Sequence, residues 1–229
     1  MTKDWNISLP DEYICESNYY LINGKKYWRV TRVKSVINQP GLNAWRASVG
    51  AKAASRVMKI RDEYGTRFHK LADIIVHGKN LGGEYGKEMQ LDLLSFKRFC
   101  KTCVIDVEAT EQKMFSDLYH IAGTADIVMK YISNPEFLKR NVEPKFNETS
   151  RVIGDWKTSK TIYDEYWIQV GAYVALFEEC TGIKLDGGII AQFRDGKINV
   201  EEKTYDELKC YFEAMKLCIK LFIFTKEGC

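Results

Sequence analysis

Two side chains in the stretch IGDWK, at positions 153–157, could act together in chemistry. The stretch is apolar and has the pattern of a β-strand. Because side chains two residues apart on a strand share a face, the carboxylate of Asp155 and the ammonium of Lys157 are expected to be neighbours. Alone, such a pair would be an ordinary surface ion pair of little energetic value.

A second carboxylate, that of Asp126, lies in a similar setting. It interrupts the apolar run 121–129, where an uncompensated charge is costly. If the strands that carry Asp126 and Asp155 are paired, two carboxylates and one ammonium converge. Neighbouring carboxylates repel each other unless a cation lies between them, and oxygen ligands suit Mg²⁺ or Mn²⁺ better than zinc or copper. The sequence therefore predicts a site for one or two Mg²⁺ or Mn²⁺ ions.

These residues belong to motifs that resemble a known group of enzymes. The motif GTAD at 123–126, followed by GDWKTSK at 154–160, resembles the active-site signature of the PD-(D/E)XK nuclease superfamily. The sequence DWKTS at 155–159 is similar to the corresponding motif of the mitochondrial genome maintenance exonuclease family and its phage and bacterial relatives. The resemblance implies a restriction-endonuclease-like core and a metal-dependent nuclease activity.

Three further matches narrow the resemblance to the RecB-like branch of the superfamily. The motif GTRFH at 65–69 resembles the GxxxH helix of that branch, and Gln169 with Tyr173 resembles its QxxxY helix. Glu111 stands fifteen residues before Asp126, as in the same relatives. The resemblance runs from about residue 32 to residue 195.

The resemblance implies a role for each matching residue of the two strands. Asp126 and Asp155 would be catalytic and would bind the metal, with the backbone carbonyl of Trp156 as a further ligand. Lys157 would orient the attacking water and stabilise developing negative charge.

Two metal ligands implied by the resemblance have ordinary alternatives. Glu111 would be the catalytic, metal-binding acid of the preceding strand, although it could be a surface residue, and Glu108 is its nearest competitor. His69 would be a metal ligand, although a histidine on a helix is commonly a structural residue.

Other residues are predicted to bind substrate. Gln169 and Tyr173 lie four apart on one helical face and would line the site near the lysine and the DNA backbone. Tyr173 also falls in the apolar stripe of its helix, so packing is a compatible role. Thr158 and Ser159 would donate hydrogen bonds to a phosphate, or else would end the strand and cap the next helix. Arg67 is a further candidate for substrate binding.

The charge distribution favours nucleic acid as the partner. The net charge of +3 is small, but residues 17–61 include ten Lys and Arg and no Asp or Glu. Tyr and Trp residues, including Trp45, are interleaved with these bases. Bases that neutralise phosphates among aromatics that stack on nucleobases are typical of a single-strand-binding groove. A solvated basic face with core aromatics is the alternative.

Hydrophobic periodicity predicts the elements that position these residues. We expect a hairpin at 19–30 through Asn23-Gly24 and a second at 187–204 through Asp195-Gly196. The expected helices are 41–59, 62–76, 87–100, 163–180 and 205–224, and the expected strands between the hairpins are 104–107, 111–115, 121–131 and 151–156. The third helix should have Met89, Leu93, Leu94, Phe96 and Phe99 on its inward face. Thr161 with Asp164 should form a capping box at the start of the fourth helix, and Gly182 should end that helix. Residues 133–150 should form a long loop or an inserted excursion.

This succession predicts an α/β fold with a mixed central β-sheet flanked by helices. We expect one nuclease domain, 1–229. Within it, residues 1–100 would form the hairpin and a helical DNA-binding region, and residues 101–229 the catalytic α/β core.

Composition limits the setting. Seven cysteines with irregular spacing and no visible export signal indicate reduced thiols and a cytoplasmic protein, or a viral protein acting in the host cytoplasm. Cys100 and Cys103 form the only close pair and are more simply thiols near the end of a helix than a metal site. No iron-sulfur cluster and no membrane association are expected.

Residues and resemblance together favour a divalent-metal-dependent deoxyribonuclease, in particular a single-strand-preferring exonuclease of replication, repair or recombination. Its partners would be DNA, single-stranded or with free ends, and a replication or recombination protein. One alternative is an endonuclease on duplex or branched DNA. Another is a non-catalytic nucleic-acid-binding protein on the same fold.

Overall fold

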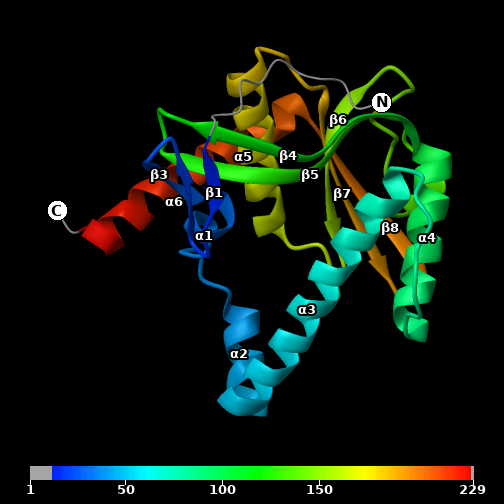
Figure 1. Ribbon diagram of the computed structural model, residues 1–229, viewed down its shortest axis with the longest axis horizontal. Coiled ribbons are helices and arrows are strands. Elements are labelled where there is room, and N and C mark those ends of the chain that lie inside the picture. Colours follow the sequence, from blue (N-terminus) through cyan, green and yellow to red (C-terminus); the bar gives the residue numbers. More distant parts are fainter. Residues whose placement is uncertain (1–11, 228–229) are drawn as a thin grey trace.

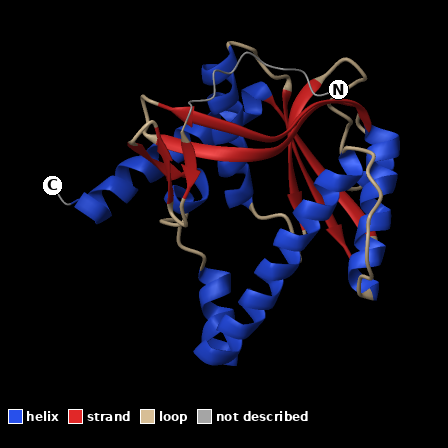
Figure 2. Ribbon diagram, viewed as in Figure 1, coloured by secondary structure: helices blue, strands red, loops and turns tan. Residues whose placement is uncertain are grey.

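A mixed β-sheet forms the centre of the molecule, and helices cover both of its faces (Figures 1 and 2). The computed structural model describes residues 12–227 of the chain. The sheet has eight strands in the order β1-β2-β3-β5-β6-β7-β8, with β4 paired to β5. These are β1 (Tyr13–Cys15), β2 (Tyr19–Ile22), β3 (Lys25–Arg29), β4 (Val104–Ser116), β5 (Ile121–Tyr131), β6 (Arg151–Lys157), β7 (Gly187–Arg194) and β8 (Lys197–Thr204). The expected α/β fold with a mixed central sheet is confirmed.

The helices form two layers, each with its own apolar core. They are α1 (Val30–Lys34), α2 (Pro40–Val49), α3 (Ala51–Val76), α4 (Lys87–Cys103), α5 (Asp164–Thr181) and α6 (Tyr205–Glu227). Helices α3 and α4 pack on one face of the sheet through residues such as Phe68, Phe96 and Phe99. Helices α1, α5 and α6 pack on the other face. Within residues 12–227, no helix combines the length and the apolar character needed to cross a bilayer.

Both predicted hairpin turns are present. Asn23 and Gly24 have φ values of 48° and 73°, and Asp195 and Gly196 have values of 53° and 73°. Left-handed backbone at both central residues matches the twist of the flanking strands, which explains the choice of Asn-Gly and Asp-Gly.

The helix boundaries differ from the sequence prediction in the N-terminal region. The predicted division between helices 41–59 and 62–76 is wrong, because the break lies at Gly50, where φ is 82° and ψ is 148°. Helix α3 then continues without interruption to Val76. Leu94 was expected to point inward but is 62% exposed, since it lies just outside the buried stripe of α4.

The strands predicted at 104–107 and 111–115 form one long strand, β4. Its register shifts between Val104 and Asp106 and between Val107 and Ala109 mark two β-bulges. A bulge adds a residue and reverses the alternation of faces, so periodicity divides a strand that is continuous.

Of the two predictions for the ends of α5, the one for its start is wrong and the one for its end is confirmed. The capping box predicted for Thr161 and Asp164 is absent, because the residue before the helix is Tyr163, whose side chain makes no capping hydrogen bond. Gly182 ends the helix with a φ of 68°, as predicted.

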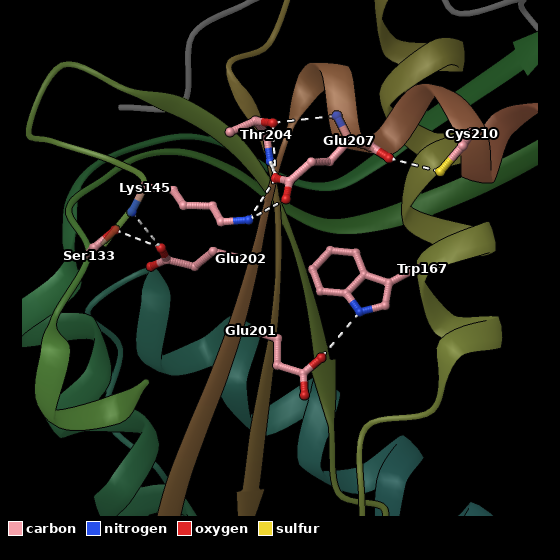
Figure 3. Close-up of polar contacts among 8 residues, drawn as sticks. All are labelled: Ser133, Lys145, Trp167, Glu201, Glu202, Thr204, Glu207 and Cys210. Carbon is pink, nitrogen blue, oxygen red and sulfur yellow. Dashed lines mark hydrogen bonds and ion pairs between the residues drawn. The ribbon is translucent and has the colours of Figure 1, made fainter. Parts of the chain in front are cut away.

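The excursion between β5 and β6 is held against β8 by a buried carboxylate. Glu202 is 6% exposed and accepts hydrogen bonds from the Ser133 hydroxyl at 2.9 Å and the Lys145 backbone N–H at 3.0 Å (Figure 3). The Tyr131 hydroxyl donates to the same carboxylate at 2.7 Å. Lys145 also forms an ion pair with Glu207 of α6 at 2.5 Å. The excursion is therefore part of the packed structure.

Gly154 permits the close packing of β6 against its neighbours. A Cβ atom added there would lie 2.7 Å from Cγ2 of Ile127 and 3.2 Å from the Trp156 ring. Its φ lies outside the left-handed region, so the requirement for glycine is one of space.

We expect Gly154→Ala to lower the free energy of unfolding by about 1 to 3 kcal/mol, because overpacking displaces neighbouring core side chains. Chemical denaturation measures the change. Gly82→Ala is the matched control, since an added Cβ meets nothing within 4 Å there. Equal stability of the two variants would contradict this account of Gly154.

Candidate active site

The candidate site lies where the sheet divides along one edge of β5. On that edge β3 pairs with Ile121 and Ala122, and β6 pairs with residues from Ile127 to Lys130. Residues 123–126, the GTAD motif, lie between these two ladders. The Trp156 N–H, beyond the last β5–β6 pair, donates to Oδ2 of Asp126 at 2.7 Å. The carboxylate thus takes the place of a strand partner at this point.

Asp126 is paired with a histidine from the helix layer formed by α3 and α4. Nδ1 of His69, on α3, lies 3.0 Å from Oδ1 of Asp126. Burial lowers the pKa of His69, but the charge and hydrogen bond of Asp126 outweigh burial and raise it overall. Burial raises the pKa of Asp126, whereas His69 and Lys157 lower it, and the net direction is down. These directions favour a charged pair.

Asp155 and Lys157 are neighbours on one face of β6, as the strand periodicity predicts. Nζ of Lys157 forms an ion pair with Oδ2 of Asp155, which is 3% exposed. Burial raises the pKa of Asp155, and the nearby Asp126 carboxylate adds to the increase. Oδ2 is buried and receives no directed hydrogen bond within the described chain, so the ion pair is what compensates it.

Helix α5 supplies the remaining hydrogen bonds. Nε2 of Gln169 donates to Oδ1 of Asp155 at 3.1 Å and to the Tyr173 hydroxyl at 3.0 Å. A Cβ atom added at Gly123 would lie 2.5 Å from Cε1 of Tyr173, so the glycine of the GTAD motif makes room for this ring. Both interpretations of Tyr173 are therefore compatible with its place, since it is buried and bonded to Gln169.

The sequence analysis missed Lys34, which lies at the end of α1. Its Nζ donates to Oε1 of Gln169 at 3.2 Å and lies 4.9 Å from the centre of the Tyr166 ring, as does Nζ of Lys157. Burial and the charge of Lys157 lower the pKa of Lys34 to about 8. Because a lysine only donates, this bond also fixes which end of the Gln169 amide faces Asp155. Lys34 is one of ten bases in residues 17–61, and nothing in the sequence marks it as the buried one.

The two candidate glutamates of β4 have different surroundings. Glu108 is fully buried and forms a bidentate ion pair with Arg151, at 2.5 Å and 3.0 Å. Glu111 has a φ of 46° in the middle of the strand. Loss of hydration and the Asp126 carboxylate raise the pKa of Glu111, whereas His69 lowers it. Glu111 is exposed, which agrees with the surface position considered for it, and the charges of Asp126 and His69 still shift its pKa. Its role as a metal ligand stays a prediction.

Thr158 and Ser159 form the turn after β6. The Ser159 hydroxyl donates to the Thr161 carbonyl at 2.8 Å, and the Ser159 carbonyl accepts from Gln192 at 2.7 Å. Gly65 of α3 passes close by, since a Cβ atom there would lie 3.5 Å from Oγ1 of Thr158. Thr158 and Ser159 thus follow the end of the strand, as the structural alternative predicts, but neither caps α5, whose N-cap is Tyr163. A phosphate contact stays a prediction.

Arg67 and Trp45 are not brought to the carboxylates. The Arg67 guanidinium lies 5.1 Å from the centre of the Tyr85 ring, on the outer side of α3. Trp45 lies on α2, which projects away from the sheet together with the first turns of α3 (Figure 1). We call α2 and residues 51–70 of α3 the helical arm.

The helical arm contains a groove of about 1180 Å³. Its lining includes the bases Arg46, Lys59, Arg67 and Lys70 and the acids Asp62 and Glu63. The groove is separate from the carboxylate cluster.

The donor types suit a hard divalent cation. Asp126 and Asp155 offer carboxylate oxygens and His69 offers an imidazole nitrogen, and Oδ2 of Asp155 is buried without a directed donor. Oxygen-rich sets of this kind favour Mg²⁺ or Mn²⁺. Among residues 12–227, however, no three His, Cys, Asp or Glu side chains are gathered closely enough to form a ready metal cluster.

Cys100 and Cys103 lie in the last turn of α4, as expected for thiols near a helix end. Burial raises the pKa of these two thiols, to about 12 and about 11. Burial therefore favours the protonated form of both thiols.

Comparison with known proteins adds little. No protein-family model matches the chain, and no curated protein matches it. Among solved structures the chain is similar to the one described as "Crystal structure of SSO0001", with 15% sequence identity and a TM-score of 0.37, covering 89% of this chain and 78% of that chain. A likeness this distant carries no argument about fold or function.

We expect Mn²⁺ to raise the midpoint of thermal unfolding of the wild-type protein. An ion that binds only the folded state adds about 2.7 kcal/mol of stability when its free concentration is about 100 times its dissociation constant. Asp126→Asn and Asp155→Asn should each lose most of the shift, whereas Asp106→Asn, on the exposed surface of β4, should keep it. Thermal scans with and without Mn²⁺ measure the shift, and its persistence in both site variants would contradict a metal site here.

Proposed function

We propose that this protein is a divalent-metal-dependent deoxyribonuclease, in particular an exonuclease that prefers single-stranded DNA. The observation that carries the proposal is the meeting of Asp126, Asp155 and Lys157 on adjacent strands, with His69 beside them. Burying two carboxylates so close together is costly for a purely structural role. The resemblance of the same residues to the RecB-like nucleases is independent support.

The chemistry would be hydrolysis of a phosphodiester by water. Asp126, Asp155, His69 and Glu111 would hold the cation, which when bound lowers the pKa of a water and neutralises phosphate charge. Lys157 would donate to a phosphate oxygen and stabilise the charge that develops there. Gln169 holds the Asp155 carboxylate in a fixed orientation, and Lys34 holds Gln169.

The helical arm supports DNA as the substrate class. Its groove is lined by more bases than acids, and Lys52 and Arg56 of the same helix are exposed. The basic surface of the helical arm would neutralise the phosphate charges of a DNA strand that enters the site. The DNA strand would pass along the helical arm to reach the site.

One observation favours the non-catalytic alternative. The charges of the cluster compensate each other in pairs, His69 with Asp126 and Lys157 with Asp155. Such pairing is what a purely structural cluster would also need. Tight DNA binding without cleavage in Mg²⁺ or Mn²⁺ would favour a binding protein. Cleavage of circular single-stranded DNA would favour an endonuclease, because an exonuclease requires an end.

We expect the wild-type protein to degrade end-labelled linear single-stranded DNA in Mn²⁺ or Mg²⁺ and to lose this activity in EDTA. Lys157→Met and Asp155→Asn should each lower the rate by at least about 100-fold, since each removes charge stabilisation or a metal ligand. Lys197→Met, an exposed lysine on β8, is the matched control. Full activity of Lys157→Met, or in EDTA, would overturn the mechanism.

A separate variant tests the helical arm. Replacing Arg46, Lys59 and Lys70 together by Gln should weaken binding of single-stranded DNA and reduce its salt dependence. The slope of log K against log salt should fall by about 2, because each phosphate contact contributes about 0.7. Fluorescence anisotropy in the Asp155→Asn background measures binding without cleavage.

The control for this variant replaces Lys97, Lys101 and Lys197, which are exposed outside the arm. An equal change of slope in the two triple variants would show that net charge, and not the groove, determines binding.

A further inference from the structure

Helix α6 carries a second apolar stripe on the side that faces solvent. Leu217, Leu221 and Phe224 are 66%, 48% and 58% exposed. The opposite side of the helix is packed into the protein through residues such as Met215 and Phe222, both at most 2% exposed. A helix that only covers a core needs one apolar stripe, so the second one indicates a partner.

The spacing of the exposed stripe is that of a coiled coil. Cys210, Ala214, Leu217, Leu221 and Phe224 follow one another at intervals of four, three, four and three residues. These are the a and d positions of two heptads, which place a straight seam along one helix face. We call these five residues the α6 seam. It spans roughly 22 Å at 1.5 Å per residue.

The residues beside the α6 seam select a second copy of this chain in antiparallel orientation. One flank carries Glu213 and Lys220, both exposed, and Glu213 also forms an ion pair with Lys216 of its own helix. The other flank carries Tyr211, Cys218 and Thr225, none of which is an acidic or basic residue, and Tyr211 and Cys218 pack against the protein's own core. A parallel pair would set each charged flank against an uncharged one. An antiparallel pair sets Glu213 against the partner's Lys220, and two-fold symmetry repeats the contact.

We infer that the α6 seam pairs with that of a second copy to form an antiparallel homodimer. The C-terminal end of α6 extends past the sheet at the side of the molecule, so a second helix can approach it (Figure 1). Two heptads make a short contact, and the dimer is therefore weak and depends on protein concentration. This inference is independent of the proposed nuclease activity.

Sedimentation across a concentration series tests the dimer. The wild-type protein should pass from monomer to dimer, whereas Leu217→Lys/Leu221→Lys should remain monomeric over the same range. Leu94→Lys on α4 is the control, because Leu94 is equally exposed, at 62%, but belongs to no stripe. A wild-type protein that stays monomeric, or an equal loss in the control, overturns the inference.

A charge exchange tests the orientation and does not depend on the leucine variants. Glu213→Lys should weaken the dimer at least about tenfold by setting lysines against each other. Glu213→Lys/Lys220→Glu should restore it, because the opposite charges meet again. Circular dichroism confirms that each variant is folded. A double variant no better than Glu213→Lys, or a disulfide between the Cys210 residues of the two copies on mild oxidation, overturns the antiparallel arrangement.

Discussion

The carboxylates of Asp126 and Asp155 are buried on neighbouring strands, and each must be balanced where it lies. Their hydration is limited, since Asp155 is 3% exposed and the Asp126 side chain 14%. The balance comes from three directions, with Lys157 on the same strand, His69 from α3 and Gln169 from α5. An unpaired buried charge would cost several kcal/mol, so the packing of both helix layers depends on delivering these groups.

The same requirement explains where the sheet divides. A continuous ladder across residues 123–126 would satisfy the backbone but would leave no room at that edge for the side chains that meet Asp126. With β3 paired to the start of β5 and β6 to its end, α5 can approach the gap between them. Gly123 then accommodates the Tyr173 ring, which would collide with any larger residue. The need to compensate the two carboxylates therefore accounts for both the sheet topology and the geometry of the site.

Much of this arrangement could be predicted from the sequence because it depends on local periodicity. Strand alternation placed Asp155 beside Lys157, and two apolar runs of strand type made their pairing a reasonable expectation. Bulges in β4 and the break at Gly50 were not predicted, since each interrupts a period without changing composition. Lys34 was missed for another reason. It bonds to a residue 135 positions away, and nothing in its own segment separates it from the other bases.

The balance of charges also bears on how the proposed nuclease would hold a cation. Within this arrangement Lys157 forms an ion pair with Oδ2 of Asp155, a buried carboxylate oxygen that receives no directed hydrogen bond from the described residues. A divalent ion would therefore compete with an ammonium group for the same oxygen, and its binding would free Lys157 to face a phosphate. Lys34 donates to Gln169 in the same region, and the charge of Lys157 helps to lower its pKa to about 8. The charge state of Lys34 is therefore linked to the position of Lys157.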